Sequence, residues 1–420
     1  MLDVALIRAN PDIIRATLQN RGYSEDLLDE FLRIDGEWRR DVEESNQLKR
    51  KRNLVSEEIP KLKGEEKKQK IDEMRKVSDR IKVLDAMIQE LDQRRSYIVL
   101  NMPNIPHPSV PEGRCTEDNV TVREFGSPRS FDFTPKAHFE IGEELDIIDF
   151  ARGTKIAGSG FYVMKGDGAR LERALINYML DLHKAQGYRE ISPPAVINRQ
   201  AVIGTGQYPK MADDMYWCER DDLWLNPTAE VPVTNLHMDE ILERKDLPIY
   251  YTAYLPSFRR EAGKHADTRG IVRVHQFNKV ELVKFTLPET SFDELETLLA
   301  DAEAVARDLE LPYRVQCLCT GDLGFASAKT YDIEAHAPGI DSWLEISSCS
   351  CFTDFQARRA RIKFRPEPHL KSEFVHTLNG SGVALPRTVA SVLENYQNSD
   401  GTVTVPKVLR PYMQGQEVIC

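Results

Sequence analysis

Residues 258–281 read FRREAGKHADTRGIVRVHQFNKVE and place arginines and carboxylates at both ends of a hairpin. Upstream, YYTAYLPSF alternates and is rich in tyrosine, and downstream HQFNKVELVKF alternates again, so both flanks are predicted to be strands. The loop between the two strands is long and polar. Arginines gathered at strand ends bind phosphate and carboxylate groups well. The hairpin is therefore a candidate binding site for a polyanion.

The bulk composition indicates a protein of two or more domains with an ample core. The chain has 420 residues, of which 41% are hydrophobic and 29% are charged. Its seven cysteines form an odd, sparse set that is typical of reduced thiols in the cytosol. No signal peptide is recognisable, and no window approaches the ~18 apolar residues of a membrane span. We therefore expect a cytoplasmic protein without a membrane segment.

The first hundred residues are predicted to be helical. Residues 1–24 suggest one short amphipathic helix, with Ile13, Ile14 and Leu18 on one side. Residues 27–98 predict an antiparallel coiled coil of two helices, because apolar residues recur at steps of three and four and Gly64 interrupts them. The seam of the second helix is Met74, Val77, Ile81, Leu84, Ile88, Leu91 and Ile98. At about 30 residues each, the helices would extend roughly 45 Å.

This helical arm is also the basic part of the chain. Residues 38–98 hold 17 Lys and Arg against 13 Asp and Glu, a net charge of +4 in a chain of net charge −11. The charges could simply keep an exposed coiled coil in solution. Alternatively, the arm could lie along a nucleic-acid backbone, where neutralised phosphates dominate the affinity.

The remaining sequence is divided at a proline-rich linker. NMPNIPHPSVPEG, at 101–113, ends any helix and opens a linker and entry segment over 101–135. In 136–420, one amphipathic helix is predicted to stop at Gly187, and another to begin with a capping box formed by Ser291 and Glu294. Strands and helices intermix there without regular alternation. We predict an α+β fold with a mainly antiparallel sheet.

Four further stretches carry residues suited to chemistry, although the glycine-rich nucleotide fingerprints are absent. NPTAEVPV (226–233) offers a hydroxyl and a carboxylate in a polar turn. LEISSCS (344–350) predicts a strand carrying Glu345 and Ser348, oxygen ligands of the kind that Mg²⁺ prefers. NGSGVALPRTVASVLENYQ (379–397) reads as a glycine-rich turn leading into a helix, and GYREISPP (187–194) as a strand that ends in two prolines.

At these positions the sequence resembles the class II aminoacyl-tRNA synthetases, and specifically the seryl-tRNA synthetase family. The three family signatures occur in order: a helix and strand ending in proline, the FRxE hairpin, and a glycine-rich turn before an arginine-bearing helix. The opening MLDVALIRANP, the arm, the NIPHPSVP linker, GTGQYPK (204–210), DFQARR (354–359) and LRPYM extend the resemblance over almost the whole chain. The resemblance implies a class II catalytic domain over 136–420, built on an antiparallel sheet, and an N-terminal tRNA-binding domain over 1–100.

The implied activity is ATP-dependent activation of L-serine and its transfer to tRNA(Ser); whether tRNA(Sec) is also charged is left open. Arg259 would bind the ATP α-phosphate, Glu261 the adenine amino group and Arg387 the γ-phosphate, with Phe277 and Arg387 on the two adenine faces. The implied ATP-binding set is Arg259, Arg260, Glu261, Val274, Phe277, Glu345, Ile346, Ser347, Ser348 and Arg387. The implied serine-binding set is Thr228, Ala229, Glu230, Arg259, Glu281, Asn379 and Ser381. Catalysis would rest on Arg259, Glu345, Ser348 and Arg387, and Glu345 and Ser348 would hold Mg²⁺.

The resemblance also implies a two-fold homodimer through the double-proline signature, with the arm of one subunit serving a tRNA bound to the other. Two departures stand out. Pro386 precedes Arg387 where many bacterial members have glycine, which predicts a stiffer helix start. The loop GKHADTRG (263–270), which the resemblance places at the tRNA acceptor end, differs from commoner versions of this loop.

Two alternatives stay open on the sequence alone. The pairs Cys317/Cys319 and Cys349/Cys351 could form a four-thiolate zinc site, but the spacing is one residue where two is usual, and no zinc is expected. The chain could also be a non-catalytic paralogue, or one that loads a carrier protein. Arg259, Glu345 and Arg387 are all present, and the arm is intact, which argues against both.

Overall fold

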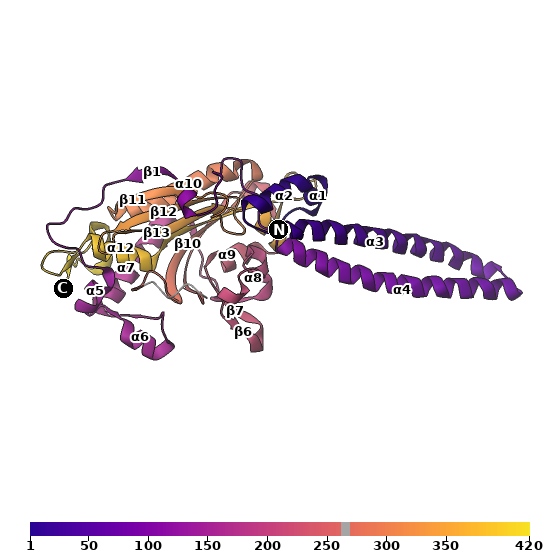
Figure 1. Ribbon diagram of the computed structural model, residues 1–420, viewed down its shortest axis with the longest axis horizontal. Coiled ribbons are helices and arrows are strands. Elements are labelled where there is room, and N and C mark those ends of the chain that lie inside the picture. The colour runs from indigo at the N-terminus through magenta and orange to yellow at the C-terminus, as the bar shows by residue number, and fades with distance from the viewer. Residues whose placement is uncertain (262–268) are drawn as a thin grey trace. The chain divides into compact units, whose positions relative to one another are not determined.

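The computed structural model describes residues 1–261 and 269–420, and Figure 1 shows the order of its elements. Contacts divide the chain into two compact units. One is Leu2–Met102, and the other consists of Pro103–Cys420 together with Met1. Among the described residues, no helix has both the length and the apolar character needed to cross a bilayer.

The helical unit opens with two short helices, α1 (Val4–Ala9) and α2 (Pro11–Asn20), where the sequence predicted one. Pro11 is the first residue of α2, a position that favours proline because its missing N–H would have no helical partner. Ile14 and Leu18 are buried as expected, but Ile13 is 49% exposed and does not share their face.

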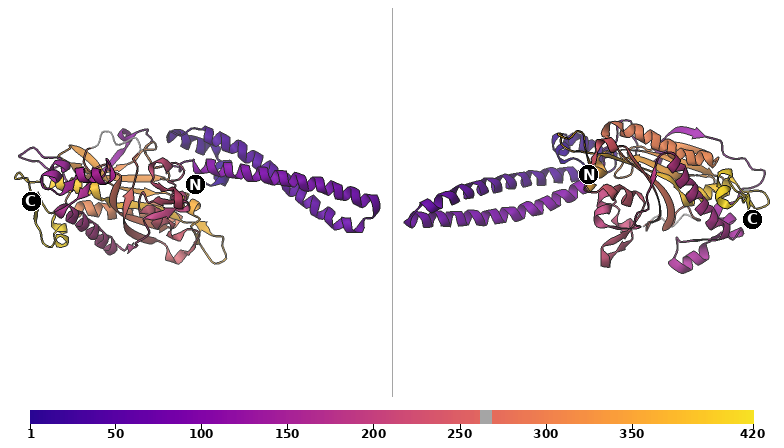
Figure 2. Two further views of the ribbon diagram at one scale, coloured as in Figure 1. Left: turned by 90° about the horizontal axis from the view of Figure 1, so that it is seen from below. Right: turned by 180° about the vertical axis from the view of Figure 1, so that it is seen from behind.

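Two long helices, α3 (Asp26–Glu58) and α4 (Gly64–Leu100), confirm the predicted coiled coil and lie side by side in both figures (Figures 1 and 2). A single 3₁₀ turn, Ile59–Lys61, joins α3 to the connection, and Gly64 has the positive φ of +63° that starts the return. With 33 and 37 residues, the helices extend about 50 and 55 Å, slightly more than predicted.

The seam between α3 and α4 is apolar and flanked by ion pairs. Met74, Ile81, Leu84 and Ile98 are buried, whereas Val77, Ile88 and Leu91 are half-buried. Ser45, which interrupts the apolar pattern of α3, is buried and donates a hydrogen bond of 2.9 Å to Asp85. At the base of the pair, the buried carboxylate of Asp35 accepts hydrogen bonds from Arg8 and Arg95.

The second unit is built on an eight-stranded sheet of order β1-β11-β12-β13-β16-β10-β9-β4. Every neighbouring pair is antiparallel except β4 with β9, which confirms the predicted α+β class. The strands are β1 (Val120–Phe125), β4 (Arg189–Glu190), β9 (Ile249–Phe258), β10 (Gln276–Thr286), β11 (Tyr313–Cys317), β12 (Lys329–Ala337), β13 (Ser342–Cys351) and β16 (His376–Ala384). The hairpin flanks predicted to be strands are β9 and β10.

The main core against this sheet is built largely from α7 (Gly166–Ala185), α10 (Ser291–Asp308) and α12 (Leu385–Asn395), with Ile141 of α5 (His138–Glu144) added to it. The other helices of the unit are α6 (Phe150–Ala157), α8 (Arg199–Thr205), α9 (Glu230–Thr234) and α11 (Phe355–Ala360). Short strands form small sheets: β2 (Ile148–Asp149) with β3 (Val163–Met164); β5 (Val196–Asn198), β7 (Leu223–Leu225) and β6 (Trp217–Cys218); β8 (Ile241–Glu243), β14 (Lys363–Arg365) and β15 (Glu373–Phe374); and β17 (Val403–Thr404) with β18 (Val418–Ile419).

The glycine-rich stretch 379–382 is part of strand β16, so the predicted turn is wrong. A Cβ on Gly380 would come within 3.1 Å of Leu298 in α10, and a Cβ on Gly382 within 2.6 Å of His183 in α7. These glycines therefore allow helices to pack closely on the strand. Because side chains alternate along a strand, Asn379 and Ser381 face the other side of the sheet.

The sequence predicted the end of one helix at Gly187 and the start of another at Ser291. Gly187 follows α7 with φ of +97°, which confirms the predicted stop. The capping box at Ser291 is wrong, because Thr290 occupies the N-cap position and makes no side-chain cap. Glu294 instead accepts hydrogen bonds from the Tyr250 hydroxyl and, at 2.9 Å, from Lys284 Nζ.

Candidate active site

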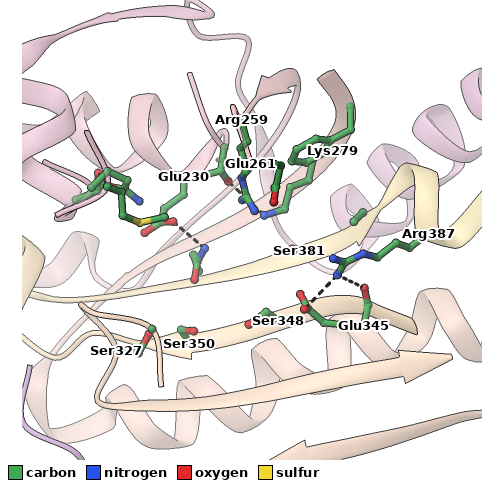
Figure 3. A pocket seen from close by; sticks show the side chains of 18 of the residues that line it. Glu230, Arg259, Glu261, Lys279, Ser327, Glu345, Ser348, Ser350, Ser381 and Arg387 are labelled. Carbon is green, nitrogen blue, oxygen red and sulfur yellow. Dashed lines mark hydrogen bonds and ion pairs between the residues drawn. The ribbon is translucent and has the colours of Figure 1, made fainter. Parts of the chain in front are cut away.

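A cavity of about 340 Å³ lies on the sheet face that Asn379 and Ser381 share (Figure 3). It is lined by residues just after β9, by β10, β13 and β16, by the start of α12, and by the segments 271–274 and 324–327. The predicted site residues among its lining are Thr228, Glu230, Arg259, Glu261, Val274, Phe277, Glu345, Ser348, Asn379, Ser381 and Arg387. Residues separated by 159 positions in the sequence are thus brought together by the antiparallel topology.

Five predicted residues do not line the cavity. Arg260 is exposed, and its guanidinium donates to the Asp213 carbonyl at 3.3 Å. The buried Ser347 hydroxyl donates to the Ser381 carbonyl at 2.6 Å, so it supports the cavity wall from behind. The remaining three are Ala229, Glu281 and Ile346, all fully buried.

Two guanidinium groups reach the cavity from different elements (Figure 3). Arg259 follows β9, and its Nε donates to the Pro227 carbonyl at 3.2 Å while its guanidinium carbon lies 5.2 Å from the Phe277 ring centroid. Arg387 lies in the first turn of α12 and donates through Nη1 to the carbonyl oxygen of Glu345 at 2.8 Å, with a carboxylate oxygen of Glu345 at 3.1 Å. This part of the cavity is suited to phosphate groups.

Beside Arg259, the cavity offers an aromatic face and a carboxylate. Phe277 is half-buried, and Val274 lines the same region. Glu261, with φ of +48°, pairs with Arg273 at 2.7 Å. Arg273 was not identified from the sequence, because nothing in the spacing of the hairpin shows which cation faces Glu261.

A buried cluster of polar side chains lies near Arg259 (Figure 3). Glu281 is fully buried and accepts hydrogen bonds from the Thr228 hydroxyl and from Asn379 Nδ2, the latter at 3.3 Å. Lys279 Nζ lies 2.7 Å from the Glu281 carboxylate and donates to Thr228 at 3.2 Å. Sequence reasoning missed Lys279, although the two-residue period from Phe277 through Lys279 to Glu281 is a signal that could have found it.

Glu230, in the same cluster, has a strongly shifted pKa. Burial, followed by the charge of Glu281, raises the pKa of Glu230 from 4.5 to about 7. Its two oxygens accept hydrogen bonds from Gln356 at 2.6 Å and Asn379 at 3.1 Å. Gln356 is itself held by the Thr377 hydroxyl at 2.8 Å and belongs to the DFQARR motif, to which the sequence assigned no role.

Glu345 and Ser348 fit a divalent cation. Residues three apart on a regular strand point to opposite faces, but the pairing of β13 with β12 shifts register so that Ile346 has no partner in β12. This bulge brings both side chains to the cavity, where Glu345 is 45% exposed. A carboxylate and a hydroxyl beside the Arg387 guanidinium are ligands that Mg²⁺ accepts.

The cysteines of the zinc alternative do not share one site. Cys317 pairs with Tyr331 of β12, and Tyr331 pairs in turn with Cys349 of β13, so a whole strand separates the two pairs. Two strand spacings amount to about 10 Å, too far for four sulfurs around one zinc ion. Within the described parts of the chain, no three His, Cys, Asp or Glu side chains are grouped to hold a metal ion.

The expected contact of the hairpin loop with a tRNA acceptor end involves residues 263–268, which lie outside the described residues.

Comparison with known proteins gives consistent matches at both ends of the chain. Residues 1–106 match the family described as seryl-tRNA synthetase N-terminal domain, and residues 216–396 match the tRNA synthetase class II core domain (G, H, P, S and T). The chain is 55% identical over 422 residues to serine–tRNA ligase of Methanosarcina barkeri, covering 100% of this chain and 99% of that protein. It is 57% identical over 417 residues to serine–tRNA ligase of Carboxydothermus hydrogenoformans, covering 98% of each.

Among solved structures, the fold is similar to that of seryl-tRNA synthetase from Pyrococcus horikoshii complexed with ATP. The TM-score is 0.95 at 40% sequence identity, and the match covers 100% of this chain and 99% of the other.

Proposed function

Because the chain belongs to the seryl-tRNA synthetase family and is a class II serine–tRNA ligase, we propose that the cavity flanked by Arg259 and Arg387 is where serine reacts with ATP. The observation that carries this proposal is that one cavity combines groups suited to phosphates with a buried carboxylate suited to an ammonium group. Arg387 and Glu345 mark the phosphate end, Glu230 marks the serine end, and Arg259 lies near enough to Glu230 for its charge to act on that carboxyl (Figure 3).

At the phosphate end, Arg259 binds the α-phosphate with two donors and stays charged throughout the reaction. Phe277 stacks on the adenine, and Glu261 accepts a hydrogen bond from its amino group. Arg387 covers the other adenine face and reaches the γ-phosphate, for which it exchanges its present contact with Glu345. The match to serine–tRNA ligases over 98–100% of the chain, together with Arg259, Glu345 and Arg387 in the cavity lining, favours a ligase over a non-catalytic or carrier-loading paralogue.

At the serine end, Glu230 binds the ammonium group, and Glu281, buried outside the cavity lining, holds the Thr228 hydroxyl in place. Thr228 and Ser381 contribute to the recognition of the side-chain hydroxyl. An analogue without the hydroxyl, such as alanine, would leave buried polar groups unpaired, which discriminates more strongly than an apolar pocket can.

The reaction proceeds in two steps. A carboxylate oxygen of serine attacks the α-phosphorus, the bond to the bridging oxygen breaks, and pyrophosphate leaves. The serine carboxylate is already ionised, so no protein base is needed and this chain contributes position and positive charge. The oxygen of a terminal ribose hydroxyl of the tRNA then attacks the acyl carbon, the bond between that carbon and the phosphate oxygen breaks, and AMP leaves as the hydroxyl proton is released.

Glu345 and Ser348 are the residues that would hold Mg²⁺. The ion would neutralise phosphate charge during transfer. Arg387 contacts Glu345 and adjoins this pair, so the guanidinium and the cation would act on the same phosphates.

The arm formed by α3 and α4 is proposed to bind tRNA(Ser) through its backbone. Its length of about 50 Å and its net charge of +4 over 38–98 support contact with phosphates and overall shape rather than with bases. A two-fold homodimer, with the arm of one subunit serving a tRNA on the other, completes the proposal.

A matched pair of variants tests the serine site. Thr228→Val removes the hydroxyl that contacts Glu281 and should raise the KM for serine by at least ~10-fold while leaving the KM for ATP unchanged. Thr234→Val is the control, because Thr234 is equally buried and its hydroxyl makes no hydrogen bond. Equal serine KM values in the two variants would remove Thr228 from the site.

A further inference from the structure

His138 and Glu394 form a fully buried pair outside the cavity. His138 opens α5, and Glu394 lies in α12, the helix that also carries Arg387. His138 Nδ1 lies 2.7 Å from a carboxylate oxygen of Glu394, and both side chains are 0% exposed. A buried carboxylate is stable only when hydrogen-bond donors surround it. The donors around Glu394 therefore identify the segments that the pair connects.

The Glu394 carboxylate is surrounded by donors. It accepts from the His138 backbone N–H at 2.9 Å and from the backbone N–H groups of Gly339 at 2.7 Å and Ile340 at 3.2 Å. Since a carboxylate can only accept, His138 Nδ1 must carry the proton that it donates to Glu394. The other ring nitrogen, Nε2, is then an acceptor.

His138 Nε2 accepts the backbone N–H of Ile271 at 3.2 Å. Gly270, immediately before Ile271, has φ of +89°, and a Cβ there would lie 2.1 Å from the same nitrogen. Only glycine lets the backbone approach the ring this closely. The chain after the hairpin loop is therefore attached to the imidazole.

The attached segment forms one wall of the cavity at the ATP end. Ile271, Val272 and Arg273 all line it. The Val272 carbonyl accepts from Arg387 Nε at 3.3 Å, and Arg273 holds Glu261. The displacement of this segment would therefore disturb both the guanidinium and the carboxylate proposed to bind ATP.

We propose that His138, oriented by Glu394, is a positioning residue for the ATP half of the active site. It acts through Ile271, and none of its described hydrogen bonds or ion pairs reaches Thr228, Glu230 or Glu281, the residues proposed to bind serine. Nothing in the sequence signatures assigns a role to either member of the pair, and the inference rests on the proposed ATP site.

Two substitutions separate the two ring nitrogens. His138→Asn retains a donor near Nδ1 for Glu394 but has no acceptor at Nε2, whereas His138→Gln can place its amide oxygen near Nε2. The Asn variant should raise the dissociation constant and the KM for ATP about fivefold, the effect of one lost hydrogen bond, with the KM for serine unchanged. The Gln variant should stay within about twofold of the wild type.

ATP affinity is measured by calorimetry without serine, and KM values by ATP–pyrophosphate exchange, with the unfolding temperature of each variant as a control for folding. If the Asn variant does not fold, Gly270→Ala disturbs the same contact from the other side and should give the same ATP-selective loss. Equal ATP affinities in the Asn and Gln variants, or a serine KM that rises as much as the ATP KM, would overturn the role of His138. If the wild type binds ATP but shows no serine-dependent exchange, the proposed function is contradicted. The role of His138 is still tested in that case, because it depends on the ATP affinities of the variants.

Discussion

The replacement of Glu230 by glutamine should stabilise the protein at pH 8 but not at pH 5. Burial is the main cause that raises the pKa of Glu230 from 4.5 to about 7, and the charge of Glu281 adds to it. The folded chain therefore holds this proton more tightly than the unfolded chain, and stability is lost as the pH rises from about 4.5 through 7. The ionised carboxylate costs ~3 kcal/mol at pH 8 and less than ~1 kcal/mol at pH 5.

Glutamine cannot reproduce both hydrogen bonds of Glu230. The carboxylate accepts from Gln356 at 2.6 Å and from Asn379 at 3.1 Å, and an amide offers only one oxygen, so one donor loses its partner at a cost of ~1–2 kcal/mol. The net gain at pH 8 is ~1–2 kcal/mol, which should raise Tm by about 2–4 °C. At pH 5 the lost hydrogen bond dominates, and Tm should fall.

Differential scanning fluorimetry at pH 5 and pH 8 checks this prediction. The same variant should raise the KM for serine at least ~10-fold at pH 8, because the ammonium group loses a carboxylate partner. A Tm change of the same sign and size at both pH values would refute the reasoning, since a purely structural defect does not depend on the protonation of Glu230.

Three further predictions follow from the geometry. Arg259→Ala should slow serine-dependent ATP–pyrophosphate exchange by at least ~10²-fold, the scale for a lost transition-state donor; a near-wild-type rate would remove Arg259 from the mechanism. Gly382→Ala places a Cβ 2.6 Å from His183 and should lower the unfolding free energy by ~1–3 kcal/mol. Gly36→Ala lies in helix α3, where the added Cβ meets no atom within 4 Å, and should raise the unfolding free energy by ~1 kcal/mol. Thermal unfolding of both variants checks this, and a change of the same sign in both would contradict the packing argument. Asp35→Asn removes the buried carboxylate that accepts hydrogen bonds from Arg8 and Arg95, and it should destabilise the helical unit by ~1–3 kcal/mol, because both arginines stay partly exposed and keep some hydration. The urea midpoint followed by far-ultraviolet circular dichroism checks this, and an unchanged midpoint would show that the carboxylate is dispensable.

Periodic features were predictable because their signal is local. The helices α3 and α4 repeat apolar residues every three or four positions, and β9 and β10 alternate, so the arm and the hairpin flanks follow from the chain itself. The stretch 379–382 was misread because glycine also permits close packing, and only the helices above β16 show which use applies.

Eleven of the residues that line the cavity were predictable from the sequence, but the pairing among them was not. The antiparallel order of β9, β10, β16 and β13 brings together motifs that are distant in sequence. Partners such as Arg273 for Glu261 and Gln356 for Glu230 come from separate elements without a fixed spacing, and only the folded structure shows them. The bulge at Ile346 likewise depends on the pairing of β13 with β12.

The most direct test of the proposed site is ATP–pyrophosphate exchange by the purified protein, run separately with each of the twenty amino acids in the presence of Mg²⁺. We expect exchange with serine alone, and its loss in the Arg259→Ala variant. Exchange with a different amino acid would contradict the assignment of the serine pocket, and no exchange from folded protein would contradict the proposed chemistry of the cavity.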